Sequence, residues 1–384
     1  MKDVVIIGGG FGGLSAARRL AEASREIRVT LLDRKATFDF LPLLPDIVGG
    51  RIPPAAASLG LDGLARRHGF AFHNDSAEKI DPGRRAVIGR RGAYPFDALL
   101  VAAGSEPNYF GDSALQHSSY SFNSCRDSER LVEALSGASV ETCVIAGGGY
   151  TGIEMATHIR RRFARGNRAL RIIIVEASAS ILGAMPDWIR RYARGNLARL
   201  DIGVMENCRL AGISGGQVRL SSGAVFERAL AIWCAGVQAP AFVRELPFDK
   251  GPQGRLLVNS RLEINGRPGL FAIGDSAAFM CGPLPLRMSV QFARTQGARA
   301  AGNIVRYLQG GRLRDYRPFD PGFVLPMANG RSCGAVGGLR LRGQLPTALH
   351  YVMSLMLSPG WPQKARVLSA LWNGRQKKEE REAP

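Results

Sequence analysis

The sequence lacks closely spaced cysteines. Its six cysteines contain no C-x-x-C or C-x-x-x-x-C pair and stand at positions 125, 143, 208, 234, 281 and 333. This spacing excludes a local metal knuckle and a local redox disulfide. It favours free, buried thiols in a reducing compartment. We therefore expect no bound metal.

Long apolar runs are also absent. No stretch reaches the roughly twenty apolar residues that a membrane-spanning helix needs. The first strand-like segment, Val4 to Ile7, begins almost at once, so we expect no secretory signal. At 384 residues the chain is long enough for two or three domains with their own cores.

Acidic residues are scarce relative to basic ones. The chain has 32 Asp and Glu against 51 Lys and Arg, giving a net charge of +19 and a pI near 10.4. Such a surface attracts nucleic acid, anionic lipid or acidic small molecules. No nucleic-acid motif accompanies the charge, so we expect no nucleic-acid partner. Attraction to a membrane surface, or plain compositional bias, explains it better.

A dinucleotide-binding pattern opens the chain. The buried-strand pattern of Val4 to Ile7 is followed by Gly8, Gly10 and Gly13 as G-x-G-x-x-G, then by helical spacing, a second apolar strand and Asp33. The first glycine allows a tight turn, the second lets a pyrophosphate approach, and the third allows close helix–strand packing. The helix N-terminus attracts phosphate, and Asp33 can accept hydrogen bonds from a ribose.

The same pattern recurs in the middle of the chain. The strand-like run Thr142 to Ala146 precedes Gly147, Gly149 and Gly152, a helix, a second apolar strand from Arg171 to Val175, and then Glu176. Two such units predict an α/β protein with two Rossmann-like dinucleotide-binding domains, and hence an enzyme that uses two nucleotides.

Two glutamates of this second unit carry functional hypotheses. Glu176 ends the strand, and a carboxylate there bonds a free ribose hydroxyl and repels a 2′-phosphate. This predicts a preference for NADH over NADPH. Glu154 lies two residues after Gly152. It either complements the dipole of the helix or projects into the cleft between the nucleotides, and we favour the cleft.

Later segments repeat or complete the pattern. Two strand-like runs, Leu99 to Gly104 and Ala229 to Gly236, end in small residues that let a cofactor approach the backbone. The run Leu270 to Asp275 ends in Gly-Asp, whose aspartate can bond the ribityl chain of a flavin. A helix is predicted from Ser289 to Tyr307, where Gln291, Thr295 and Gln296 face either the cofactor or solvent. The proline-containing stretch Phe40 to Pro45 predicts a loop or short helix.

The C-terminal fifty residues change character. Leu345 to Leu357 is apolar but too short to span a bilayer, and Ala365 to Trp372 predicts a second short helix. Aromatic residues and cations around these helices suit an anchor that lies in the membrane interface. The alternative is a dimer interface, or a helix pair packed on the body of the protein.

Taken together, these residues resemble type II NADH:quinone oxidoreductases over essentially the whole chain. The resemblance rests on Ile7 to Leu14, Phe40 to Leu44, Ala103 to Gly111, Gly147 to Glu154, Trp233 to Val237 and Ala272 to Asp275. It implies FAD on the first unit and NADH on the second. It also implies electron transfer from NADH through FAD to a membrane quinone, without proton pumping.

The resemblance also implies an organisation. The expected domains are 1–112 and 252–330 for FAD, 113–251 for NADH, and 331–384 as a hairpin with membrane-associating helices. The enzyme would lie peripherally on the cytoplasmic face of the inner membrane, with a homodimer left open. The expected catalytic residues are Glu154 and Gln291. The expected cofactor-binding residues are Gly8, Gly10, Phe11, Gly12, Gly13, Asp33, Arg34, Pro42, Ala103, Gly104, Gly147, Gly149, Tyr150, Thr151, Gly152, Glu176, Ala235, Gly236, Gly274 and Asp275.

Departures from the family pattern leave alternatives open. The quinone-side helix has Val290 and Thr295 where the family has Ala and Gln. A sulfide:quinone oxidoreductase needs two cysteines beside the flavin, and Cys125 and Cys333 are the candidates. Its partner loop, however, carries Tyr150 and Thr151 in place of a cysteine. A soluble reductase of a protein acceptor and a flavin-binding redox sensor are the remaining alternatives, both suggested by the basic surface.

Overall fold

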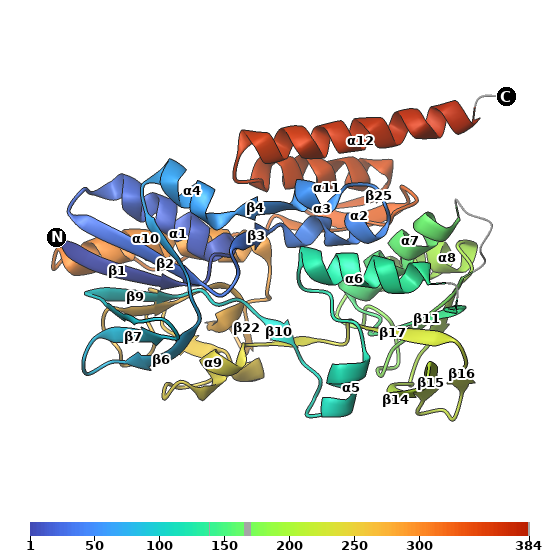
Figure 1. Ribbon diagram of the computed structural model, residues 1–384, viewed down its shortest axis with the longest axis horizontal. Coiled ribbons are helices and arrows are strands. Elements are labelled where there is room, and N and C mark those ends of the chain that lie inside the picture. The colour runs from blue at the N-terminus through green and yellow to red at the C-terminus, as the bar shows by residue number, and fades with distance from the viewer. Residues whose placement is uncertain (138, 165–169, 383–384) are drawn as a thin grey trace. The chain divides into compact units, whose positions relative to one another are not determined.

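The computed structural model describes residues 1–137, 139–164 and 170–382, with side chains as far as residue 372 (Figure 1). The chain forms two compact units. Unit 1 comprises Met1–Phe38, Leu59–Glu106 and Val237–Asp320, and unit 2 comprises Asp39–Ser58, Pro107–Gly236 and Pro321–Pro384. Each unit is thus assembled from three separate segments of the chain.

The core of unit 1 is a five-stranded sheet in the order β20–β9–β1–β2–β5. Its strands run parallel, as apolar strands covered on both faces do. The helix α1 (Phe11–Ala23) leads from β1 to β2, and it packs against α10 (Val290–Leu308). The strands are β1 (Lys2–Ile7), β2 (Ile27–Asp33), β5 (Ala71–Asn74), β9 (Ala98–Val101) and β20 (Leu270–Ala272).

Smaller elements complete unit 1. One three-stranded sheet contains β6 (Ala77–Asp81), β7 (Ala86–Gly89) and β8 (Ala93–Pro95), and another contains β19 (Leu256–Val258), β21 (Ala277–Cys281) and β22 (Leu284–Pro285). The short helices are α4 (Leu61–His68), α9 (Ala241–Glu245), η2 (Pro252–Gly254) and η3 (Gly274–Ser276). Four short strands lie where the chain passes between the units: β3 (Thr37–Asp39), β4 (Ser58–Gly60), β10 (Glu106–Pro107) and β18 (Val237–Gln238).

Unit 2 repeats the plan of unit 1 with a four-stranded parallel sheet. Its order is β13 (Ile202–Met205), β12 (Arg171–Val175), β11 (Thr142–Ala146) and β17 (Ala229–Trp233). The helix α7 (Tyr150–Phe163) follows β11 as α1 follows β1. The other elements of this part are α5 (Ser113–Ser118), α6 (Cys125–Ser136), α8 (Asp187–Arg199), β14 (Leu210–Ser214), β15 (Gln217–Leu220) and β16 (Val225–Phe226).

The C-terminal segment and the segment 39–58 also belong to unit 2. The former contains the antiparallel sheet of β23 (Gly322–Leu325), β24 (Ser332–Val336) and β25 (Leu339–Gly343), then α11 (Gln344–Leu357) and α12 (Trp361–Glu382). The latter contains η1 (Leu41–Leu43), α2 (Leu44–Val48) and α3 (Pro54–Ala57). α2 packs on α6 and α7, and α12 packs on α3. Among the described residues, we find no helix that combines the length and apolar character needed to cross a membrane.

The predicted α/β fold with parallel sheets is confirmed. The strands expected at Thr142–Ala146 and Arg171–Val175 match β11 and β12. The second C-terminal helix differs, because it begins at Trp361 rather than at Ala365. Pro362 does not break this helix, because it lies in the first turn, where the missing N–H has no partner in any case.

Candidate functional site

The glycine loop of unit 1 shows which glycines the protein itself requires. Gly8 has φ +105°, and a Cβ there would lie 2.2 Å from the Ala102 carbonyl oxygen. A Cβ on Gly13 would lie 1.9 Å from the Gly8 carbonyl oxygen. Gly10 is different, because a Cβ there meets nothing within 4 Å. The space beside Gly10, at the N-terminus of α1, is therefore open, as a bound pyrophosphate requires.

The loop of unit 2 has the same geometry. Gly147 has φ +110°, and its Cβ would lie 2.4 Å from the Cys234 carbonyl oxygen. A Cβ on Gly152 would lie 1.9 Å from the Gly147 carbonyl oxygen, whereas one on Gly149 meets nothing within 4 Å. The two loops thus have the same geometry and each forms a cradle for a ligand. In each, the first and third glycines allow close backbone packing, and the second leaves room for a ligand.

Each acidic residue at a strand end closes its own glycine loop. Asp33 accepts the Gly9 N–H at 2.7 Å with one carboxylate oxygen and the Lys35 N–H at 2.8 Å with the other. Glu176 repeats this, accepting the Gly148 N–H at 2.7 Å. Its other oxygen accepts the Ser178 N–H at 2.8 Å. Each oxygen keeps a second lone pair, so both carboxylates can still accept a ribose hydroxyl.

The Gly-Asp turn of unit 1 is held by two side chains. The Gly274 N–H donates to Oε1 of Gln296 at 2.7 Å, and Gln296 is buried. The Ser105 hydroxyl donates to Oδ2 of Asp275 at 2.8 Å. Burial raises the pKa of Asp275. Gly104 has φ +74° and open space beside its Cα, so the backbone here admits a ligand.

Gln296, which the sequence left facing either the cofactor or solvent, thus supports the Gly-Asp turn. Gln291, the expected catalytic residue, lies in the first turn of α10 and is partly buried. Its carbonyl oxygen accepts the Thr295 hydroxyl at 2.9 Å. Pro42 belongs to unit 2, where it lies in η1.

The other predicted ligands lie at accessible positions. The residues Arg34, Thr151 and Ala235 are exposed, while Phe11, Ala103, Tyr150 and Gly236 are partly exposed. Gly12 is the exception, because it is buried and its Cβ would lie 2.9 Å from the Ile273 side chain.

Glu154 is buried in unit 2, with 7% of its surface exposed. Burial, and then the Asp46 carboxylate, raise its pKa well above the usual value. The described residues provide its carboxyl with no hydrogen bond, whereas its carbonyl oxygen accepts from Nδ1 of His158 at 2.8 Å. Glu154 therefore carries a proton under conditions in which an exposed glutamate is ionised.

A second buried carboxyl, Asp46 on α2, was not predicted as a site residue. The Tyr351 hydroxyl donates to its Oδ1 at 2.6 Å, while Nε2 of His158 lies at 3.4 Å and Nε of Arg51 at 3.7 Å. Burial opposes ionisation of Asp46, yet His158, Arg51 and His350 hold its pKa below the usual range. The signals in the sequence were an acid inside the apolar run of α2 and a His-Tyr pair inside the apolar α11.

All six cysteines are free thiols, and the two candidates for a pair beside the flavin are both buried. Cys333 is fully buried on β24, and Cys125 is buried at the start of α6. Burial raises the pKa of Cys333 to about 12, and burial followed by Glu154 raises that of Cys234 to about 12. Such thiols are poor nucleophiles. The described residues contain no group of His, Cys, Asp and Glu side chains that could hold a metal ion.

Comparisons with known proteins agree with this geometry. A family model described as pyridine nucleotide-disulphide oxidoreductase matches residues 2–302. The demethylphylloquinone reductase NdbB of Synechocystis sp. is 27% identical, over 95% of this chain and 94% of its own. The type II NADH:quinone oxidoreductase Ndh of Mycobacterium tuberculosis is also 27% identical, over 95% and 86%.

A solved structure, NDH2 from Plasmodium falciparum in complex with NADH, superposes with a TM-score of 0.85. It is 14% identical, and the match covers 97% of this chain and 98% of that one, so it shows the shared fold. These findings confirm the resemblance drawn from the sequence.

Proposed function

The chain belongs to the pyridine nucleotide-disulphide oxidoreductase family, and on that premise we propose that it passes electrons from NADH through FAD to a membrane quinone. The observation that carries the proposal is the pair of matched cradles at Gly10 and Gly149, each open and each closed by a carboxylate. The names of the relatives, a demethylphylloquinone reductase and a type II NADH:quinone oxidoreductase, support a quinone as the acceptor.

Unit 1 is the proposed FAD site and unit 2 the proposed NADH site. Asp33 and Asp275 would bond the ribose and the ribityl chain of FAD, and the helix N-terminus behind Gly10 would face its pyrophosphate. FAD, when bound, supplies the chemistry that accepts a hydride and returns two electrons. The Gly149 cradle and Glu176 would hold NADH.

Glu154 is the proposed acid of the reaction. Oxidation of NADH by a quinone consumes one proton in addition to the transferred hydride. A buried carboxyl whose pKa is raised holds its proton more firmly and can supply it at the reacting centre. In unit 1, Gln291 is proposed to act towards the quinone, and no proton pumping is expected.

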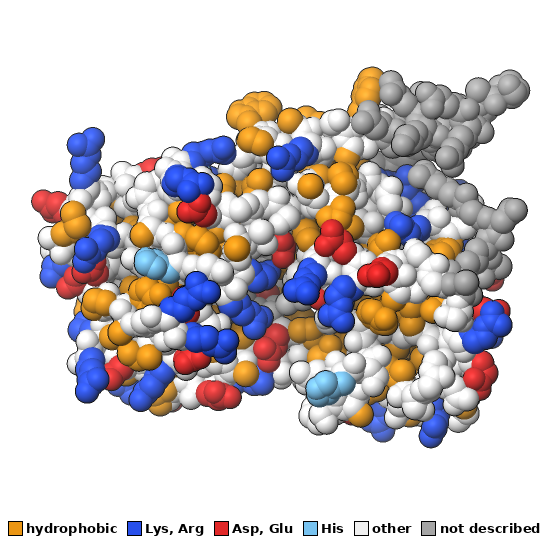
Figure 2. Space-filling view, in the orientation of Figure 1, with side chains coloured by type: hydrophobic (Ala, Val, Ile, Leu, Met, Phe, Trp, Pro, Cys, Tyr) orange, Lys and Arg blue, Asp and Glu red, His pale blue; other side chains and the backbone are white. Residues whose placement is uncertain are grey.

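The C-terminal helices are the proposed membrane contact, on the cytoplasmic face of the inner membrane. Large apolar side chains are exposed on α11 and α12: Leu345, Val352, Met356, Trp361, Leu368 and Trp372. Figure 2 shows hydrophobic side chains along the edge of the molecule at α12. Exposed tryptophans and leucines on a helix with basic residues suit a helix lying in the interface. A homodimer that covers the same residues is the competing explanation.

Anaerobic reduction tests the proposal. The purified protein should be yellow, and NADH should bleach the flavin absorption, which a ubiquinone or menaquinone analogue should restore. A flavin that NADH does not bleach would refute the oxidoreductase assignment. Reoxidation by a protein acceptor alone would replace quinone as the substrate, and reduction by sulfide would favour the sulfide:quinone alternative despite the buried cysteines.

Two variants test the finer points. Glu176→Ala should lower the preference for NADH over NADPH, and a wild-type protein that uses NADPH equally well would contradict the role of Glu176. Replacing Trp361, Leu368 and Trp372 together with glutamine should release the protein from membranes. These changes are preferable to deleting α11, because deletion also removes the Tyr351 bond to Asp46.

A further inference from the structure

A cavity in unit 2 is not used by the proposed reaction. Its volume is about 960 Å³, and it lies between the segment 47–56, α6, α7 and α12. None of the residues assigned above to FAD, NADH or quinone lines it. Its size is that of a ligand site rather than of a packing defect.

The walls of the cavity are mainly apolar. Ile47 and Ile52 come from the segment after η1, Val132 comes from α6, and Ala365 and Ala370 come from α12. We call the part of the cavity that is lined by Ala365 and Ala370 of α12 the slot. Such a lining fits a hydrocarbon chain, because burying each CH₂ group contributes about 0.8 kcal/mol.

Two arginines at the cavity form no ion pair with any described residue. Arg162 donates to the Val48 carbonyl oxygen at 3.3 Å, and Arg366 donates to the Ala55 carbonyl oxygen at 3.3 Å. Burial lowers the pKa of Arg162, because its charge is partly removed from water. A cation in that position gains from an anionic partner, and guanidinium groups match phosphate geometry.

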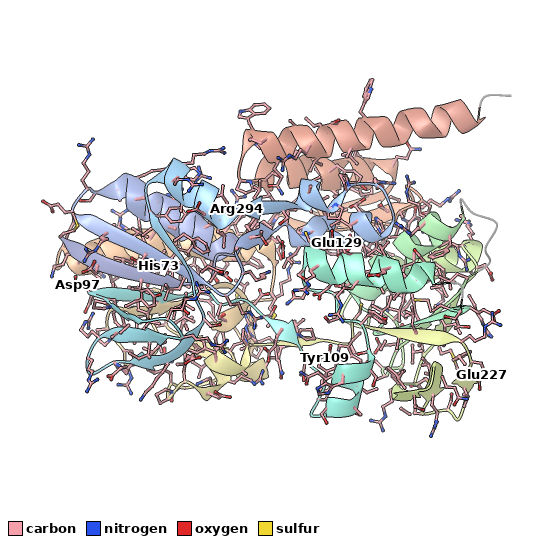
Figure 3. The ribbon with its side chains drawn as sticks, in the orientation of Figure 1. His73, Asp97, Tyr109, Glu129, Glu227 and Arg294 are labelled. Carbon is pink, nitrogen blue, oxygen red and sulfur yellow. The ribbon has the colours of Figure 1, made fainter. Side chains whose placement is uncertain are left out.

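Two glutamates complete the lining from another wall. Glu129 and Glu133 lie one turn apart on α6 and are exposed (Figure 3 labels Glu129). They also form no ion pair with a described residue. The cavity therefore combines an apolar lining with two arginines and two glutamates that form no ion pair with a described residue, while its third arginine, Arg51, is paired with Asp46.

We propose that this cavity binds a phospholipid whose head group carries both a phosphate and a primary ammonium, as in phosphatidylethanolamine. The phosphate would meet Arg162 and Arg366, the ammonium would meet Glu129 and Glu133, and an acyl chain would lie along the slot. An anionic lipid without an amine would leave the glutamates unpaired. The inference goes beyond the proposed electron transfer. It fits a lipid source beside α12, whose other residues Trp361 and Leu368 are exposed.

Binding of short-chain lipids below their micelle concentration tests the proposal without a membrane. Isothermal titration of the FAD-containing protein should show one site for dihexanoyl phosphatidylethanolamine. The phosphatidylcholine and phosphatidylglycerol analogues should bind about tenfold more weakly, because one has no N–H donor and the other no ammonium. Equal affinity for all three would overturn the proposal, as would displacement of the lipid by a short-chain quinone.

Variants of the lining sharpen the test. Arg366→Met, at an exposed position, should weaken binding about tenfold. Glu129→Gln with Glu133→Gln should remove the preference for the ethanolamine head group. Ala370→Trp should fill the slot and abolish binding, and the matched control Arg126→Met, on α6 outside the cavity, should bind normally.

Unchanged binding by Ala370→Trp would also overturn the proposal. Failure of the lipid proposal can be told apart from failure of the proposed function, because reduction of the flavin by NADH is measured on the same proteins. Ala370→Trp should lose the lipid and still show bleaching by NADH.

Discussion

Substituting Glu154 by glutamine distinguishes two roles of this residue by the sign of one measurement. If Glu154 only complements the dipole of α7, its replacement should cost about 0.3–1 kcal/mol of stability at neutral pH. If it is instead a buried carboxyl that must stay protonated, glutamine should stabilise the protein at neutral pH. The structure favours the second role, because Glu154 is 7% exposed and lies near the charged Asp46.

The magnitude follows from the pKa of Glu154, which is raised in the folded protein. Below the usual glutamate pKa of about 4.3, the residue is protonated in both the folded and the unfolded protein, so it makes the free energy of unfolding no more dependent on pH. Above it, the unfolded chain releases the proton first, so the stability of the wild type falls as pH rises towards the folded pKa. Linkage gives this fall as about 1.4 kcal/mol per pH unit. Glutamine does not titrate, so the stability of Glu154→Gln relative to the wild type should increase at that rate as pH rises.

Urea unfolding at saturating FAD, at pH 5, 6, 7 and 8, measures this advantage. The same substitution at Glu22, an exposed residue on α1, provides the matched control. An advantage of Glu154→Gln that stays constant or reverses between pH 5 and pH 8 would refute the reasoning. The same variant should also slow flavin reduction or weaken NADH binding in anaerobic stopped flow.

Two further predictions concern stability and ligand binding. Tyr351→Phe removes a hydrogen bond to the ionised Asp46 and should lower the free energy of unfolding by about 2 kcal/mol. Tyr192→Phe removes a hydroxyl that forms no hydrogen bond with a described residue, so it should be near neutral in the same denaturation assay. Gly149→Val should weaken NADH binding and leave the melting temperature nearly unchanged. Gly152→Val should fail to fold, because its Cβ would lie 1.9 Å from a carbonyl oxygen, and soluble yield with melting curves checks both.

Local patterns in the sequence predicted the parts of the fold that depend on neighbours along the chain. The strand before Gly147, the helix after it and the acid at Glu176 lie within one short segment, and their order is diagnostic. The contacts of Asp46 with Tyr351 and His158 could not be predicted in this way. Tyr351 lies 305 positions from Asp46, and His158 lies 112 positions from it, so no periodicity connects them. Only the folding of unit 2, which brings α7 and α11 against α2, makes them partners.

Asp46 and Glu154 show how one buried setting assigns opposite charge states to two carboxyls. Asp46 has a hydroxyl donor and the Arg51 guanidinium beside it, whereas the carboxyl of Glu154 has no hydrogen bond from the described residues. The first therefore remains ionised, and its charge helps to keep the second protonated. Pairs whose pKa values are driven apart are typical of acid–base sites. Because Tyr351 comes from α11, that C-terminal helix helps to set the charge next to Glu154 and cannot be a membrane contact alone.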